Sequence, residues 1–363
     1  MLSALKRIFD DSSIQVKSRI LGMYAFLFAA NIGGWIYALV AFHNRPLFIG
    51  TALLAWGYGL RHAVDADHIA AIDNVTRKLM QQGKRPITVG FFFSMGHSLV
   101  LIIGVAAIYY VKTNVNGDGF NNFNNESGII GTVVSTTFLF VIGIMNLLIA
   151  ISVYRTFKHV TRGGEYVEED FDMLLNKRGF FSRIFRPLFN LVNKGWHMLP
   201  IGFLFGLGFD TVTEVSLLAI AATEATKGMP LWSIMTFPLL FAAGMSLIDT
   251  TDGIAMLGAY GWAFVKPVRK LYYNLTITSV SVVVALVIGG IEGLGLASQE
   301  LNISGGAFWN IVGILNNNFG YLGYSIIGIF LLSWLISIAV YKFNRYDDLD
   351  VKLAAQSQGR LDR

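Results

Sequence analysis

Residues Arg61 to Asn74 read RHAVDADHIAAIDN and place two histidines, three aspartates and one arginine in a chain that is 54% hydrophobic. An uninterrupted apolar run from Pro46 to Leu60 leads directly into this stretch. The ionisable side chains are therefore predicted to lie at membrane depth rather than in a solvent-exposed loop. Each such group costs at least ~2.5 kcal/mol on insertion scales, so its presence usually marks a function.

The whole chain has the composition of a polytopic helical membrane protein. Its 363 residues have a mean hydropathy of +0.56 and only 14% charged residues, which is too apolar for a soluble fold of this length. No short apolar core with a small-residue cleavage site follows the charged N-terminus, so the first apolar run is expected to remain as a membrane span. Cysteine is absent, so any metal site must use nitrogen, oxygen or thioether ligands.

Apolar runs of about 20 residues or more predict eight transmembrane helices. These runs cover residues 20–42, 46–75, 87–111, 128–153, 198–222, 231–262, 274–297 and 321–341. Lysine and arginine are concentrated in alternate connecting segments, and only Arg45, Lys112 and Lys227 fall in the others. By the positive-inside rule, both termini are predicted to be cytoplasmic. The chain is expected to be a single transmembrane domain, residues 1–363, with a cytoplasmic N-terminal tail (1–19), loop (154–196) and C-terminal tail (342–363).

The second and sixth predicted spans are too long for straight helices across a bilayer. At 1.5 Å per residue each would exceed about 40 Å, whereas the hydrocarbon core is about 30 Å thick. Each span contains residues that weaken helices, Gly57 and Gly59 in the second and Pro238 and Gly244 in the sixth. Tilted or broken helices around a central polar site are typical of secondary transporters.

Four predicted spans carry ionisable groups at similar depths. They are Arg61, His62, Asp65, Asp67 and His68 in the second span, His97 in the third, Asp210 and Glu214 in the fifth, and Asp249 and Asp252 in the sixth. A single arginine cannot neutralise these carboxylates, so the group must be protonated, hydrated or filled by a cation. Imidazole and carboxylate without thiolate suit Ni²⁺, Co²⁺, Zn²⁺, Fe²⁺ or Mn²⁺ and argue against Cu⁺.

Helical geometry predicts a distortion in the second span. At 100° per residue, Asp67 points well away from His62 on a regular helix. A π-bulge or a break would bring the two side chains closer, and the excess length of the span already indicates one. We therefore expect a distorted helix between His62 and His68, with these residues facing His97 and the carboxylates of the fifth and sixth spans.

Some of the polar residues also have a structural interpretation. Arg61 and Asp65 are four residues apart and would neutralise each other as an ion pair. Asp73 and Arg77 have the same spacing near the inner face, where a structural pair is the favoured interpretation. Asn31, in the first span, is expected either to orient an imidazole or to bond a neighbouring helix.

These motifs resemble those of the nickel/cobalt transporter family, secondary permeases with eight transmembrane helices. The family's second-helix signature, His-x4-Asp-His within RHAxDADHI, matches His62, Asp67 and His68. Its other motifs are similar to FFFSMGHSLV around His97, LGFDTVTE in the fifth span and GMSLIDTTD in the sixth. The resemblance implies uptake of Ni²⁺, Co²⁺ or both across a bacterial cytoplasmic membrane, to supply metalloenzymes or cobalamin synthesis.

The site predicted on these grounds has His62, Asp67 and His68 as its core. Residues expected to complete the pathway or exchange protons are His97, Asp210, Glu214, Asp249 and Asp252, and the predicted set also includes Asp65 and Asn31. The expected partners are a divalent cation as substrate and the lipid bilayer, with no nucleic acid, no resident cofactor and no enzymatic reaction. Two alternatives stay open: an exporter, because ligands do not specify direction, and an intramembrane metalloenzyme, although His-Glu-x-x-His is absent.

Overall fold

The computed structural model describes residues 16–114, 119–162, 192–207, 212–263, 267–303 and 305–343. These residues form helices joined by short connections, and none of them lies in a β-strand. The predicted all-α class is confirmed. Most of the two predicted tails, residues 163–191 of the predicted cytoplasmic loop, and Asp210 lie outside the described residues.

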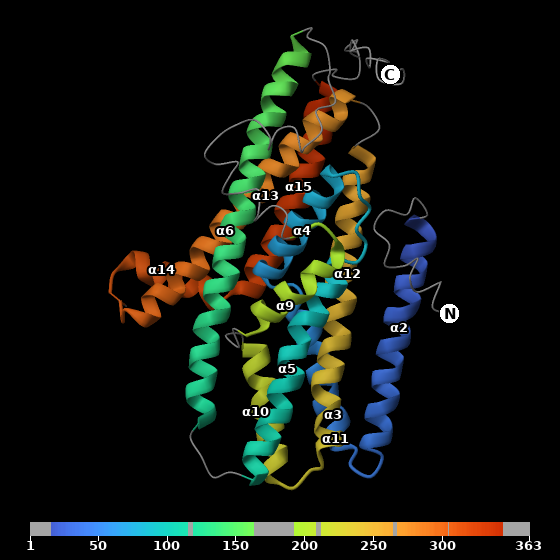
Figure 1. The fold of residues 1–363 in the computed structure, drawn as a ribbon, viewed down its shortest axis with the longest axis vertical. Coiled ribbons are helices and arrows are strands. Elements are labelled where there is room, and N and C mark those ends of the chain that lie inside the picture. The colour runs from blue at the N-terminus through green and yellow to red at the C-terminus, as the bar shows by residue number, and fades with distance from the viewer. Residues whose placement is uncertain are drawn as a thin grey trace, which may run out of the picture.

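The helices run roughly along one axis, with two exceptions noted below (Figure 1). In chain order they are α2 (Val16–Ala41), α3 (Leu47–His62), α4 (Ala66–Gln81), α5 (Val89–Asn114), α6 (Gly119–Thr161), the 3₁₀ turn η1 (Gly195–His197), α9 (Met198–Gly206), α10 (Val212–Thr226), α11 (Leu231–Ile234), α12 (Thr236–Ala263), α13 (Pro267–Glu300), α14 (Ala307–Asn316) and α15 (Phe319–Phe343). In Figure 1, α13 is strongly tilted and α14 projects to one side of the bundle.

Six helical segments in the described part of the chain are long and apolar enough to cross a membrane. They lie in α2, α5, α6, α11 with α12, α13 and α15, and a helix can cross lipid because it satisfies its own backbone hydrogen bonds. They correspond to the first, third, fourth, sixth, seventh and eighth predicted spans. The second and fifth predicted spans each contain two shorter helices, α3 with α4 and α9 with α10. The count of eight spans therefore stays a prediction.

Some helix ends differ from the predicted spans. Helix α6 extends beyond both ends of the predicted span, from Gly119 to Thr161, and so includes the start of the predicted cytoplasmic loop. Helix α14 was not predicted, because its ten residues are too few to register as a span.

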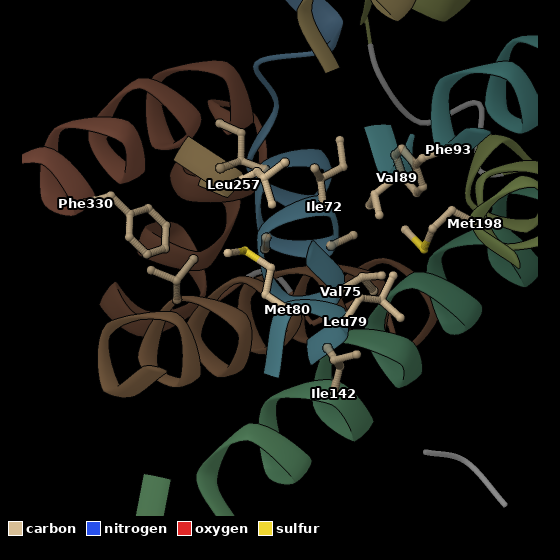
Figure 2. Packing of buried hydrophobic residues seen from close by; sticks show 14 of the residues in the cluster. Ile72, Val75, Leu79, Met80, Val89, Phe93, Ile142, Met198, Leu257 and Phe330 are labelled. Carbon is tan, nitrogen blue, oxygen red and sulfur yellow. The ribbon is translucent and has the colours of Figure 1, made fainter. Parts of the chain in front are cut away.

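Helix α4 is rich in charged residues and is nevertheless buried from His68 to Met80. Figure 2 shows it at the centre of an apolar cluster to which α5, α6, α9, α12 and α15 contribute side chains. Several of its polar groups are bonded within α4 or by neighbouring helices. Arg77 bonds Asp73 and Ser281 of α13, which confirms the predicted Asp73–Arg77 pair, and Asn146 of α6 donates to Asn74 at 2.5 Å. A charged helix can occupy this position because its charges are paired.

A second apolar cluster surrounds α3, α10 and the first half of α12. Helix α5 contributes to both clusters, with Phe93 in the first and Leu101 in the second. His97 lies between these two positions on α5. The polar site is therefore at the junction of the two apolar clusters.

Gly59 and Gly244 have a different role from the one predicted, because they pack helices together and do not break them. A Cβ atom at Gly59 would collide with the backbone of Phe241, and one at Gly244 would lie 2.7 Å from the carbonyl oxygen of Trp56. These contacts hold α3 close against α12. In the sixth span a short helix, α11, precedes the long helix α12, and the break in the second span falls after His62.

Candidate metal site

The turn between α3 and α4 places the two histidines of the second span. Helix α3 ends at His62 and α4 begins at Ala66. Asp65, between them, has an extended backbone with φ −68° and ψ 149°, and its N–H donates to the His62 carbonyl oxygen at 2.9 Å. The predicted distortion is therefore a complete break. It frees His68 from the angular relation to His62 that a continuous helix would impose.

Three imidazoles meet at this break. His62, His68 and His97 are 1%, 0% and 3% exposed, and their potential ligand atoms all lie within 4.8 Å of one another. Nε2 of His62 is 3.0 Å from Nε2 of His97. Two nitrogens on one metal ion, each at ~2.1 Å, would be about 3.0 to 3.4 Å apart. The pair therefore already has the spacing of two ligands on one ion.

Two carboxylates orient two of these rings. Asp65 Oδ2 is 2.9 Å from Nδ1 of His62, and both Asp249 oxygens are 3.3 Å from Nδ1 of His68. When Nδ1–H donates to a carboxylate, Nε2 carries the lone pair that can bind a metal. Nε2 of His68 is buried and has no hydrogen-bond partner among the described residues. The contact with Asp249 thus leaves the lone pair of Nε2 of His68 available to a metal ion.

Glu214, at the start of α10, supplies a carboxylate beside the histidines. Its Oε1 is 2.8 Å from Nε2 of His97 and 3.7 Å from Nε2 of His62, and the residue is 1% exposed. The side chain lies in the first turn of α10, where the helix dipole favours negative charge. Glu214 thereby adds a carboxylate oxygen beside two of the three imidazoles.

Two other predicted site residues, Asp67 and Asp252, lie around this centre. Asp67, in the first turn of α4, is partly exposed and within electrostatic range of His62 and His68. Asp252 is partly exposed and lies one helical turn beyond Asp249 on α12. Asp210 falls outside the described residues.

Asn31 and Arg61 contact residues other than the three histidines. The Asn31 amide donates to the carbonyl oxygen of Ala243 and accepts from the Trp56 indole at 2.9 Å, so it joins α2 to α3 and α12. Arg61 is exposed and its NH1 is 3.8 Å from Asp65 Oδ1. That ion pair exists, but Asp65 makes its shorter contact with His62.

One buried acid in a predicted span was not among the predicted site residues. Glu292 of α13 is 5% exposed, and both of its carboxylate oxygens are within 2.8 Å of the Ser135 hydroxyl of α6. The sequence could have identified Glu292, because it is an ionisable residue inside the seventh predicted span. Its described contacts are with α6 rather than with the histidines.

This fold and site define a multi-pass helical membrane protein with a buried imidazole–carboxylate centre suited to a divalent transition-metal ion. The chain belongs to the family described as high-affinity nickel-transport proteins, whose sequence model matches residues 48–340. The resemblance stated from the motifs is thus confirmed, and the members matched are transport proteins rather than enzymes.

Several relatives share most of the chain. The high-affinity nickel transport protein of Cupriavidus necator is 55% identical over 97% of this chain and 100% of its own length. The hydrogenase nickel incorporation protein HupN of Bradyrhizobium diazoefficiens is 49% identical, covering 88% of this chain and 83% of its own. The cobalt transport protein NhlF of Rhodococcus rhodochrous is 37% identical, covering 78% and 80%. No solved structure matches the chain significantly.

Proposed function

We propose that this protein is a secondary transporter that imports Ni²⁺ or Co²⁺ across the cytoplasmic membrane. The proposed substrate ligands are Nε2 of His62, His68 and His97 and the carboxylate of Glu214. The observation that carries this proposal is the convergence of three buried imidazoles within 4.8 Å, with Glu214 2.8 Å from one of them. Asp67 is proposed to line the approach to this centre.

The ligand chemistry supports a late first-row divalent ion. Imidazole nitrogen binds Ni²⁺ and Co²⁺ well, whereas Mg²⁺ and Ca²⁺ prefer an all-oxygen shell. The chain has no cysteine, so the thiolate ligands that favour Cu⁺ are absent. The names of the relatives, nickel transport for most and cobalt transport for one, agree with this range of ions.

Import into the cytoplasm is inferred from orientation and from the family. The basic segments predict cytoplasmic termini, and the family is one of high-affinity nickel-transport proteins. The chain contains no nucleotide-binding motif, which supports secondary transport. Export through the same site is the alternative, because the ligands act identically in both directions.

Uptake of radioactive Ni²⁺ by cells expressing the protein tests this function directly. We expect accumulation that excess Co²⁺ suppresses more strongly than Mn²⁺ does, and we expect His62→Ala to abolish it. His43→Ala is the matched control, because His43 is exposed on the turn after α2 and its ring contacts the local Val40 carbonyl oxygen. A fall in cellular nickel on induction would establish export instead, and undiminished uptake by His62→Ala would refute the assigned ligands.

A further inference from the structure

A second polar cluster lies on the same two helices that carry His68 and Asp249. Along α4, Asp73 and Thr76 follow His68 by five and eight residues, or about 7.5 and 12 Å at 1.5 Å per residue. Along α12, Asp252 follows Asp249 by three residues, about 4.5 Å. Both helices run toward ends that are predicted to be cytoplasmic. The cluster therefore lies on the cytoplasmic side of the histidine centre in that orientation.

Two oxygen atoms of this cluster are buried and have no hydrogen-bond partner among the described residues. They are Oγ1 of Thr76, a residue that is 0% exposed, and Oδ2 of Asp252. Thr76 points toward α12, because a Cβ atom at Gly253 would lie 3.9 Å from its Oγ1. Buried polar atoms are normally bonded, so a hydroxyl and a carboxylate oxygen left in this state at one helix interface are available to a cation.

Asp73 contributes a further carboxylate. It lies within electrostatic range of Asp252, it is fully buried, and Arg77 and Ser281 hold it in place. The guanidinium of Arg77 offsets one of the two negative charges. A cation between Asp73 and Asp252 would therefore meet a net charge of about −1, with no imidazole among these groups.

We propose that Asp252, Asp73 and Thr76 form a second, oxygen-only cation site that receives the divalent ion from the histidine centre before its release into the cytoplasm. This inference rests on the proposed transport function. Oxygen ligands hold Ni²⁺ and Co²⁺ less tightly than imidazole does, and the adjacent guanidinium weakens binding further. A weak site beside a tight one favours transport, because an ion that crosses the protein must bind and must also be able to dissociate.

Co²⁺ titration of the purified full-length protein in lipid nanodiscs tests this site. We expect two bound ions per chain: a tight one with the visible absorption of nitrogen-coordinated Co²⁺, and a weak one that Mn²⁺ displaces first. Asp252→Asn should weaken the second ion at least tenfold and leave the dissociation constant of the first within twofold. Thr76→Val should weaken the second ion about threefold. Its control is Thr251→Val, which removes an α12 hydroxyl that contacts Tyr24 of α2 instead.

The outcomes separate this inference from the function on which it rests. Loss of the second ion alone in Asp252→Asn, together with a slower maximal uptake rate, supports a release site. One ion per wild-type chain, or a parallel weakening of both ions in Asp252→Asn, overturns it. If His68→Ala leaves the tight ion unchanged and cells show no uptake, the histidine centre and the transport function fail, whereas a Mn²⁺ site sensitive to Asp252→Asn would still stand.

Discussion

At the scale of single residues, the carboxylates of the site divide into two groups with different roles. Asp65 and Asp249 contact the Nδ1 atoms of His62 and His68, whereas Glu214 contacts Nε2 of His97. The first two carboxylates therefore fix ring orientation and tautomer, and the third is placed as a ligand. Rings held in this way lose little freedom when a cation binds, which favours high affinity.

Asp249→Asn tests the orienting role. The amide oxygen can still accept from Nδ1–H of His68, but the negative charge that makes Nε2 more basic is lost. We expect the affinity for Ni²⁺ to fall by roughly 10- to 100-fold, as is usual when such a partner of a metal-binding histidine is changed. Calorimetric titration of the purified protein measures this fall, with Thr251→Val as the control. An affinity within twofold of wild type would mean that Asp249 does not act through His68.

The pH dependence of binding follows from the same residues. A metal ion binds neutral imidazole and ionised carboxylate, so protons compete with it for His62, His68 and His97. The dissociation constant for Ni²⁺ should therefore rise as the pH falls from about 8 to about 5, and binding should release protons. Titrations in buffers of different ionisation enthalpy count the protons released. A dissociation constant that does not change over this range would exclude imidazole ligation.

At the scale of elements, the turn between α3 and α4 is the feature that makes the site possible. The sequence predicted a distortion there, because the span was too long and Asp67 pointed away from His62. It did not predict the role of Gly59, because a glycine that weakens a helix and one that admits a neighbouring helix look alike in sequence. The difference depends on where α12 lies, and that is a tertiary property.

Helix α15 supports the turn from outside the set of predicted ligands. Gly323 packs so closely on the Val64 carbonyl oxygen that a Cβ atom would collide with it. We expect Gly323→Ala to displace the turn, to destabilise the protein by about 1 to 3 kcal/mol as overpacking usually does, and to weaken Ni²⁺ binding. Thermal unfolding and Ni²⁺ titration measure the two effects.

Gly328→Ala is the matched control on the same helix, since a Cβ atom there would meet nothing within 4 Å. Because alanine has the higher helix propensity, this variant should be at least as stable as wild type. Equal behaviour of the two variants would show that α15 does not support the turn.

At the scale of the whole molecule, hydropathy located the helices that face lipid better than those that form the interior. Six long apolar helices correspond to predicted spans, because their length and composition are local properties. Helix α4 was assigned to one long span, yet it is a separate interior helix whose Arg77 donates to the Ile277 carbonyl oxygen of α13 and whose Asn74 is bonded by α6. The convergence of His97, Glu214 and Asp249 was predicted because their spans place them at similar depths in the membrane. Their separate roles could be assigned only from the contacts that the structure shows.

The orientation of the bundle yields the last prediction. The C-terminal ends of α6 and α15 and the N-terminal end of α13 lie at one end of the bundle, and the C-terminal ends of α2 and α5 lie at the other (Figure 1). The first group leads into segments that are predicted to be cytoplasmic. Because the chain has no cysteine, single cysteines can report which end faces the cytoplasm.

We expect Lys227→Cys, in the turn after α10, to react with a membrane-impermeant maleimide in intact cells. Arg162→Cys, at the exposed end of α6, should react only after the cells are made permeable. The cysteine-free wild type controls for background labelling, and Ni²⁺ uptake by both variants confirms that each is folded. The reverse pattern would place the basic segments outside, and it would also turn the proposed Asp252 release site toward the exterior.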